Sequence, residues 1–152
     1  MTEPLSLSRA SLGRSVAPAI ESMLDGDVVE VRPEPGEFVV ASAIGITGTH
    51  NVTVVVRANR ATTTFFASTM FGPAEANLTE AGLADAFLEL TNVLGGAAKT
   101  AVGGENMLTL PIAIPVEKTE ADVKRADNVI SFAVCDRIVS VHVVDGALVA
   151  SE

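Results

Sequence analysis

Cysteine and the larger aromatic residues are nearly absent from this chain of 152 residues. Its one cysteine, Cys135, lies in the apolar run VISFAVC. A single cysteine cannot form an internal disulfide, which favours a reducing compartment. The sequence has no Trp, no Tyr and only six Phe. A hydrophobic core therefore has to be built from Val, Ile, Leu and Ala.

Long apolar runs and basic clusters are also missing. No run approaches the roughly 20 residues that span a bilayer, and the first 15 residues lack the apolar centre of a secretory signal. Lys and Arg number 10 against 19 Asp and Glu, which gives a net charge of −9. Phosphate backbones are bound through clustered basic side chains. We therefore expect a cytoplasmic protein that binds neither nucleic acid nor membrane.

Metal ligands and common catalytic motifs are scarce as well. His50 falls in a predicted turn and His142 alternates with valines in a predicted strand, so we expect both at the surface. Two distant histidines and one cysteine form no cluster with metal-ligand spacing. No P-loop and no G-x-S-x-G elbow occurs. We expect no cofactor of the protein's own.

The hydrophobic patterns predict a single domain over residues 1–152, and 48% hydrophobic content is enough for a packed core. The predicted elements are a helix in 15–26, strands in 27–33, 37–47 and 52–58, helices in 61–72 and 79–100, and strands in 107–116, 129–134 and 138–144. The charged stretch 117–128 is predicted to be a solvated connection. Hairpin-length turns favour an α+β fold, a long antiparallel sheet with helices packed on it, in the order α-β-β-β-α-α-β-β-β.

Prolines and helix caps leave three local alternatives open. Pro18 either begins the last part of the first helix or kinks a longer helix. Asn77 and Thr79 compete as the N-cap of the long helix. Pro111 and Pro115 make the strand that contains them irregular or place it at a sheet edge.

The long helix carries two opposed rows of side chains. Apolar residues recur at steps of three and four: Leu83, Phe87, Leu90, Leu94, Ala97 and Ala101. A second row has the same rhythm: Asp85, Glu89, Asn92, Gly96 and Lys99. At about 100° per residue, Asp85 lies about 200° from Leu83, so the polar row is nearly opposite the apolar one. Glu89 and Asn92 are three residues apart and are therefore neighbours on the outward row.

The polar row has an ordinary explanation, because every amphipathic helix has a solvated face. Gly95 and Gly96 are less ordinary, since each costs about 1 kcal/mol relative to Ala inside a helix. One interpretation is that they end the helix after Leu94. The following AAKTAV continues the apolar spacing, however, and favours one helix with a patch that lacks side chains. Another backbone can approach such a patch closely.

Three of these residues also belong to a longer pattern. Three residues separate Asp85 from Glu89, two separate Glu89 from Asn92, and twenty-two separate Asn92 from Pro115. This spacing resembles the motif of the CheC/CheX/FliY chemotaxis phosphatases, in which an Asp or Ser, a Glu, an Asn and a Pro follow at these intervals. The segments AIGITG, FFASTMFG and NVLGGAAK resemble the single-site CheX branch. The resemblance covers residues 39–115 well and the two ends loosely.

The resemblance implies a fold of long antiparallel strands with helices on one side, and a homodimer joined through sheet edges. Two-site members carry a second E-x-x-N in the first helix, but here Glu21 is followed by Leu24. We therefore expect one site per chain. Members of the family hydrolyse the aspartyl phosphate of a CheY-type response regulator, and this partner supplies its own Mg²⁺ and lysine.

Such a substrate suggests a role for each residue of the motif. An acyl phosphate is already activated, so catalysis mainly requires a water held in line with the phosphorus. We assign Asn92 to that water, because an amide donates and accepts hydrogen bonds without a charge that repels phosphate. Glu89 would pair with the partner's lysine, and Asp85 would contact the partner at the rim of the site.

Gly95 and Gly96 would let the partner's loops lie close to the helix, and Pro115 would shape the strand beside it. Two other interpretations stay open. In one, the same fold binds a response regulator or a flagellar-switch partner without turning over phosphate. In the other, the glycine-flattened helix face is the interface of a structural dimer. The completeness of the motif favours the phosphatase.

Overall fold

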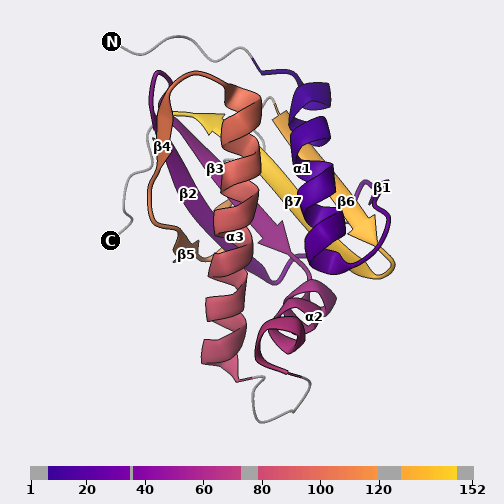
Figure 1. Cartoon of the computed structure of the whole chain (residues 1–152). Helices are drawn as coiled ribbons and strands as arrows, with labels where there is room; N and C mark the ends of the chain where they lie inside the picture. The colour runs from indigo at the N-terminus through magenta and orange to yellow at the C-terminus, as the bar shows by residue number, and fades with distance from the viewer. Residues whose placement is uncertain (1–6, 35, 73–78, 120–127, 147–152) are drawn as a thin grey trace.

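The computed structural model describes residues 7–34, 36–72, 79–119 and 128–146. Within them, seven strands form one antiparallel sheet and two long helices cover one of its faces (Figure 1). The strands are β1 (Val29–Glu30), β2 (Val40–Gly48), β3 (Val52–Ala58), β4 (Asn106–Leu108), β5 (Ile112–Ile114), β6 (Asn128–Val134) and β7 (Arg137–Asp145). The helices are α1 (Arg9–Leu24), α2 (Arg60–Phe71), α3 (Glu80–Val102) and the 3₁₀ helix η2 (Val116–Lys118). The predicted α+β class is confirmed.

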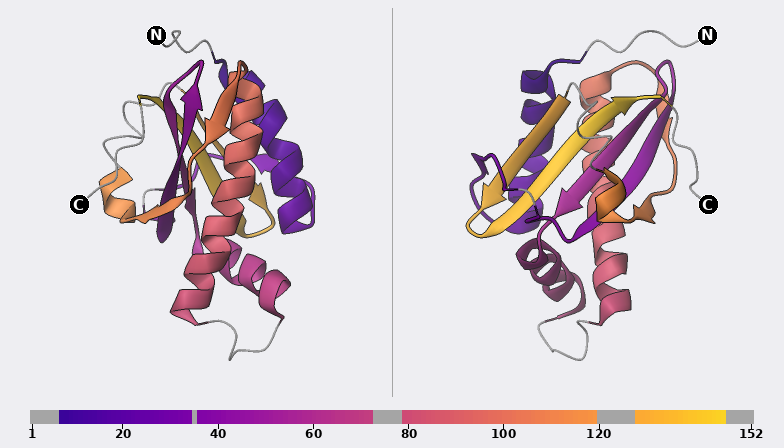
Figure 2. Two further views of the ribbon diagram at one scale, coloured as in Figure 1. Left: turned by 60° about the vertical axis from the view of Figure 1, so that its left-hand side comes forward. Right: turned by 180° about the vertical axis from the view of Figure 1, so that it is seen from behind.

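Two hairpins form the centre of the sheet. Strands β2 and β3 pair with each other, as do β6 and β7, and β3 pairs with β7 to join the hairpins. The strand order is β1-β6-β7-β3-β2-β4, and β5 also pairs with β2. Helices α1 and α3 lie on the same face, so that the strands stand in front of both when the molecule is seen from behind (Figure 2). Helix α2 lies beyond one end of the sheet and contacts α3 and β7.

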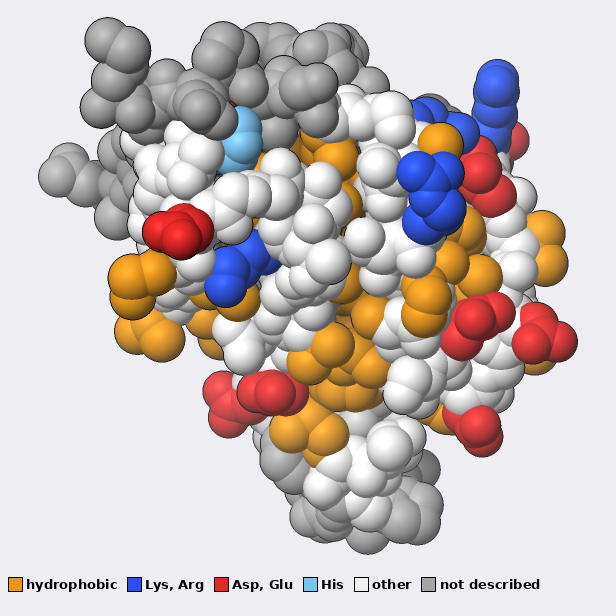
Figure 3. All heavy atoms as spheres, turned by 45° about the horizontal axis from the view of Figure 1, so that its top comes forward, with side chains coloured by type: hydrophobic (Ala, Val, Ile, Leu, Met, Phe, Trp, Pro, Cys, Tyr) orange, Lys and Arg blue, Asp and Glu red, His pale blue; other side chains and the backbone are white. Residues whose placement is uncertain are grey.

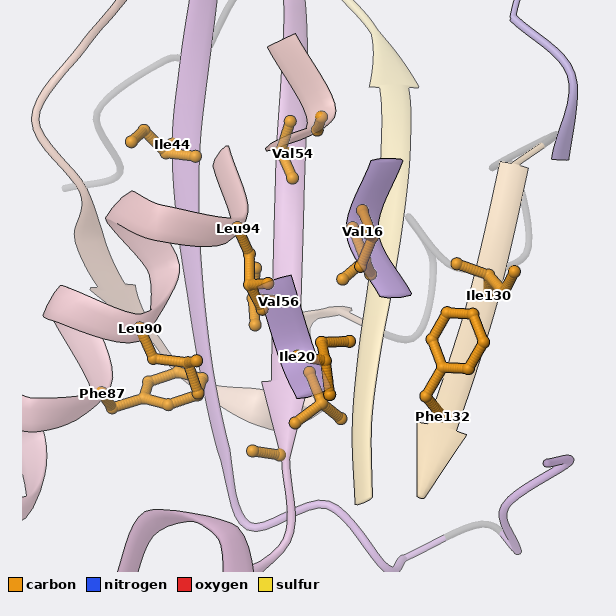
Figure 4. Packing of buried hydrophobic residues seen from close by; sticks show 14 of the residues in the cluster. Val16, Ile20, Ile44, Val54, Val56, Phe87, Leu90, Leu94, Ile130 and Phe132 are labelled. Atoms are coloured by element: carbon orange, nitrogen blue, oxygen red, sulfur yellow. The ribbon is translucent and has the colours of Figure 1, made fainter. Parts of the chain in front are cut away.

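The core lies between the sheet and the two long helices (Figure 4). Helix α1 presents Leu12, Val16, Ile20 and Leu24 to it, one residue per turn, and all four are fully buried. The sheet contributes alternate residues to the core, such as Val54 and Val56 of β3, because side chains along a strand alternate between faces. Each fully buried Val, Leu or Ile side chain stabilises the fold by about 1.5–3 kcal/mol. The core also contains Phe66, Phe87 and Phe132, but most of it is aliphatic, as the shortage of aromatic residues predicts.

The first helix is longer than predicted. Helix α1 begins at Arg9, where the hydroxyl of Ser8 caps it by accepting a hydrogen bond from the Ser11 amide (3.0 Å). Pro18 lies inside this helix and is exposed. Of the two alternatives for Pro18, the longer helix is therefore the observed one. Its ring points toward solvent, where a missing backbone N–H is least costly.

Strand lengths differ from the prediction at both edges of the sheet. Strand β1 has only two residues, Val29–Glu30, although the alternating pattern covers 27–33. The single strand predicted for 107–116 is two strands, β4 and β5, because Pro111 cannot donate to the ladder and interrupts the pairing with β2. The observed order therefore has one strand more than predicted after α3. Helix η2 was not predicted, and residues 120–127 of the expected solvated connection lie outside the described residues.

Helix α3 begins and ends with clear caps. The Thr79 hydroxyl accepts a hydrogen bond from the Gly82 amide (3.0 Å), which makes Thr79 the N-cap; its competitor Asn77 lies outside the described residues. The helix runs through both internal glycines to Val102. Gly103 then adopts a φ of +75°, a conformation that favours glycine. The prediction of one continuous helix is confirmed, and the alternative that ends it after Leu94 is wrong.

His142 is buried, although its alternation with valines predicts a surface position. Its Nε2 accepts a hydrogen bond from Arg57 Nε (3.1 Å) and lies 2.9 Å from Ser140 Oγ. Burial, with the positive charge of Arg57 as a second cause, lowers the pKa of His142 to about 3. His50 is also largely buried, with 8% of its surface exposed. Strand alternation predicts a polar surface only where one sheet face is solvated, and both faces of β7 are covered at its centre.

Candidate functional site

The inward face of α3 fixes which of its residues reach solvent. Thr91 and Gly95, one turn apart, both lie on the buried side of the helix. The Thr91 hydroxyl is hydrogen-bonded to the hydroxyl of Ser42 on β2, and Gly95 lies against Ile44 of the same strand. Because residue 92 is about 100° from residue 91 around the helix, Asn92 is directed away from this contact.

Asp85, Glu89 and Asn92 are all exposed, as their spacing predicts. Glu89 and Asn92 lie on adjacent turns of one continuous helix, where residues three apart are neighbours. Within the described part of the chain, neither of these two side chains makes a hydrogen bond or an ion pair. An exposed carboxylate and an exposed amide therefore stand side by side with their polar atoms available to a second molecule.

The two glycines of α3 differ in their surroundings. A Cβ atom added at Gly95 would lie 2.8 Å from Ile44 Cγ2, closer than real Cβ contacts. A Cβ added at Gly96 would meet no atom within 4 Å. Gly95 therefore allows the helix to pack closely on β2, and the expectation that it faces a partner is corrected. Gly96 alone keeps the open position that the sequence suggested for both.

The buried row of α3 also shifts along its length. Ala97 and Ala101, predicted as core residues, are only partly buried, whereas Ala98 and Val102 are buried instead. The predicted row is correct from Leu83 to Leu94. Helix α3 contacts both β2 and β4, and Gly95, just beyond Leu94, lies against Ile44 of β2.

Pro115 lies directly after β5 and before η2, and it is exposed. Its carbonyl accepts a hydrogen bond from the Lys118 amide (3.0 Å), which starts the 3₁₀ turn. Strand β5 pairs with β2 and also contacts α3. The proline of the motif therefore ends an edge strand that lies beside the helix with Glu89 and Asn92.

A shallow cavity of about 310 Å³ continues the surface beyond Asn92 toward the end of α3. It is lined by Gly96, Lys99, Thr100, Gly103, Gly104 and Leu108. On the face in Figure 3, acidic and basic side chains are interspersed with hydrophobic ones. This cavity was not predicted, since it depends on how β4 returns beside α3; the pair Gly103–Gly104 after the helix is its only signal in the sequence.

Metal clusters and membrane-spanning helices are both absent from the described residues. They contain no group of three or more His, Cys, Asp or Glu side chains arranged to hold a metal ion. No helix among them is long and apolar enough to cross a bilayer.

The family model described as chemotaxis phosphatase CheX matches residues 40–135. This range includes β2, α3 and the four motif residues. No curated protein matches the chain.

Solved structures with the same fold come from several bacteria. A chain of the CheX-CheY-BeF3-Mg²⁺ complex from Borrelia burgdorferi is 17% identical, with a TM-score of 0.70; the match covers 93% of this chain and 99% of that one. The chemotaxis protein CheX from Vibrio vulnificus is 14% identical, with a TM-score of 0.66 and coverage of 91% and 99%. A chemotaxis protein from Desulfovibrio vulgaris Hildenborough is 16% identical, with a TM-score of 0.60 and coverage of 88% and 93%. At these identities the likeness establishes the fold.

Proposed function

The chain belongs to the family of the chemotaxis phosphatase CheX, and from this premise we propose that it hydrolyses the aspartyl phosphate of a CheY-type response regulator. The similar chain from Borrelia burgdorferi occurs in a complex with CheY and Mg²⁺, which supports a regulator of this class as the partner. The observation that carries the proposal is the pair Glu89 and Asn92, which are adjacent and exposed on one continuous helix.

The reaction requires few catalytic groups from this chain. The oxygen of a water attacks the phosphorus, the bond between phosphorus and the aspartate oxygen breaks, and the carboxylate leaves with the bonding electrons. The water's proton passes to a phosphate oxygen, so the products are inorganic phosphate and the free aspartate. Positioning and electrostatics dominate the catalysis of phosphoryl transfer. The Mg²⁺ and the lysine that neutralise the phosphoryl oxygens belong to the partner.

Asn92 holds the attacking water. Its carbonyl oxygen accepts a hydrogen bond from the water while its NH₂ group donates to an oxygen of the phosphoryl group or of the water. A neutral amide does this without repelling the anionic substrate. A carboxylate at position 92 would place a second negative charge close to the phosphate.

Glu89 and Asp85 bind the partner instead of the phosphate. One turn separates them along the outward row, and both carry negative charge toward solvent. Glu89 pairs with the active-site lysine of the regulator, which sets the register of docking. Asp85 contacts the partner at the rim. Gly96 leaves room for a partner loop, and Pro115 ends β5 beside the helix.

Helix α1 provides no second site. Glu21, which occupies the position of the second motif's Glu, accepts a hydrogen bond from the Val28 amide (3.2 Å) and anchors the chain after the helix. Leu24 stands where the motif has Asn and is fully buried. These contacts support one site per chain. A homodimer joined through sheet edges, with β1 at one edge and β4 and β5 at the other, completes the proposal.

The test is the decay of phosphorylated response regulators from the host, each with and without the protein. For the true substrate, the protein accelerates release of phosphate, and Asn92→Ala lowers kcat about 100-fold. Glu89→Ala raises KM for the regulator, whereas Glu80→Ala, which removes an exposed carboxylate from the first turn of the same helix, leaves KM unchanged. Binding of a regulator without acceleration of its decay would favour the non-catalytic module. Failure of every regulator to bind would favour the structural dimer.

A further inference from the structure

A pair of buried hydroxyl groups joins α3 to the sheet directly behind the candidate site. Ser42 and Thr91 are both fully buried, and their hydroxyl oxygens are hydrogen-bonded to each other. The Thr91 hydroxyl also donates to the carbonyl of Phe87 (2.8 Å). Since each hydroxyl has one proton, Ser42 is the donor to Thr91. The two bonds satisfy both buried hydroxyl groups, which would otherwise be costly to bury.

One turn further along, α3 makes a second close contact with the same strand. Gly95 lies against Ile44, at a distance that leaves no room for a Cβ atom. Ser42 and Ile44 share one face of β2, because they are two residues apart. Thr91 and Gly95 share one face of α3, because they are four residues apart. The two contacts are thus in register, and Asn92 lies between them in the sequence.

Strand β2, which makes both contacts with α3, is paired with a neighbouring strand on each side. Ser42 pairs with Val56 on β3 and with Ala113 on β5, so its backbone is held on both sides. The same β5 leads directly into Pro115. The hydrogen bond between Ser42 and Thr91 differs from apolar packing in one respect. A hydrogen bond has a preferred direction and length, whereas apolar contact is non-directional.

We propose that Ser42 and Thr91 are positioning residues for the reaction, and that their hydrogen bond sets the rotation of α3 on β2 that aims Asn92. This inference rests on the proposed function. A side chain on a helix reaches about 5–6 Å from the axis, so a rotation of 10° would move its tip by about 1 Å. A displacement of that size lowers the rate of a reaction that depends on a positioned water by about 100-fold.

The test compares kcat and KM for a phosphorylated regulator among four proteins. Thr91→Val keeps the shape of the side chain but removes the hydroxyl, and it lowers kcat at least tenfold while KM stays within about twofold. Thr91→Ser restores the hydroxyl and returns kcat to near the wild-type value. In the double variant Ser42→Ala/Thr91→Val, neither hydroxyl is left unpaired, so thermal stability recovers while kcat stays low.

Two controls separate positioning from general damage to the fold. Thr69→Val removes an exposed hydroxyl that donates to the Phe65 carbonyl within α2 (3.0 Å), outside the candidate site, and it leaves kcat unchanged. Val134→Ala opens the core on β6, which packs against α1, and destabilises the protein without a loss of kcat per folded molecule.

A Thr91→Val protein with wild-type kcat would overturn this inference while leaving the proposed function intact. So would a double variant that recovers kcat together with stability, because the hydroxyls would then act on folding alone. A wild-type protein that accelerates no regulator's decay would overturn the proposed function, and this inference with it.

Discussion

Gly95→Ala and Gly96→Ala form a matched pair of substitutions that tests how α3 sits on the sheet. Both add one methyl group to the interior of the same helix, and both gain about 1 kcal/mol of helix propensity. The added methyl at Gly96 meets no atom within 4 Å, so that gain remains. We expect Gly96→Ala to raise the free energy of unfolding by about 1 kcal/mol.

At Gly95 the same methyl group would lie 2.8 Å from Ile44 Cγ2 and 3.1 Å from Ile44 Cδ1. The side chain of Ile44 is fully buried. Overpacking of this kind costs about 1–3 kcal/mol. Because the propensity gain is common to both variants, Gly95→Ala is expected to be about 1–3 kcal/mol less stable than Gly96→Ala.

Urea denaturation followed by far-ultraviolet circular dichroism measures this difference, which corresponds to about 2–4 °C in Tm for each kcal/mol in a chain of this size. Equal stabilisation by the two substitutions would refute the close contact of α3 with β2. The proposed docking surface adds a second readout. Gly96→Ala should raise KM for the phosphorylated regulator with little change in kcat, since its new methyl group would stand where we propose that a partner loop approaches.

Three further predictions concern stability away from the site. The pKa of His142 is about 3 in the folded protein against 6.5 in the unfolded chain, so below pH 6.5 the unfolded chain takes up a proton that the folded one does not. The free energy of unfolding should therefore fall by up to about 1.4 kcal/mol per pH unit from pH 6.5 to 3. Urea titrations at several pH values should show a shallower fall for His142→Gln. Asn59→Ala removes the hydrogen bond that its side chain donates to the Asp136 carbonyl (2.8 Å) and the one that it accepts from the Ile138 amide (3.1 Å). The free energy of unfolding should fall by about 1–3 kcal/mol, and an unchanged urea midpoint would contradict this. Thr79→Ala removes the N-cap of α3 and should lower Tm by an amount equivalent to about 1 kcal/mol, whereas an unaltered melting curve would show that the cap contributes nothing.

Local structure was largely predictable from the sequence. The helix over 61–72, the hairpin turn at 48–51 and the short connection at 135–137 were predicted from nearby residues whose preferences agree with the fold. The course of α3 through two glycines was also predictable, because the apolar spacing resumes beyond them. The lengths of the edge strands were less predictable. Strand β1 is shorter than the alternating segment 27–33, since pairing with a neighbouring strand decides where a strand ends.

Features that depend on distant parts of the chain were not predictable. His142 was expected in solvent because strand alternation does not reveal whether both faces of the sheet are covered. The helical spacing placed Gly96 in the outward row, but it could not show that Gly95 meets Ile44 of a distant strand.

The candidate site also has one part that was predictable from the sequence and one part that was not. Asp85, Glu89, Asn92 and Pro115 were found through a motif whose spacing is written in the sequence. The hydrogen bond between Ser42 and Thr91 joins residues 49 positions apart and is visible only in the folded chain. The residues expected to do the chemistry could thus be named in advance, whereas those that hold them in place could not.

The central claim is tested most directly by turnover with the protein at substoichiometric concentration. A phosphorylated CheY-type regulator is mixed with about one-twentieth of its amount of this protein, and the release of inorganic phosphate is followed beyond one equivalent. We predict that many equivalents are released at an accelerated rate and that Asn92→Ala, though folded, gives only the regulator's own slow decay. Wild-type acceleration that stops at one equivalent, or that survives intact in Asn92→Ala, would contradict the account.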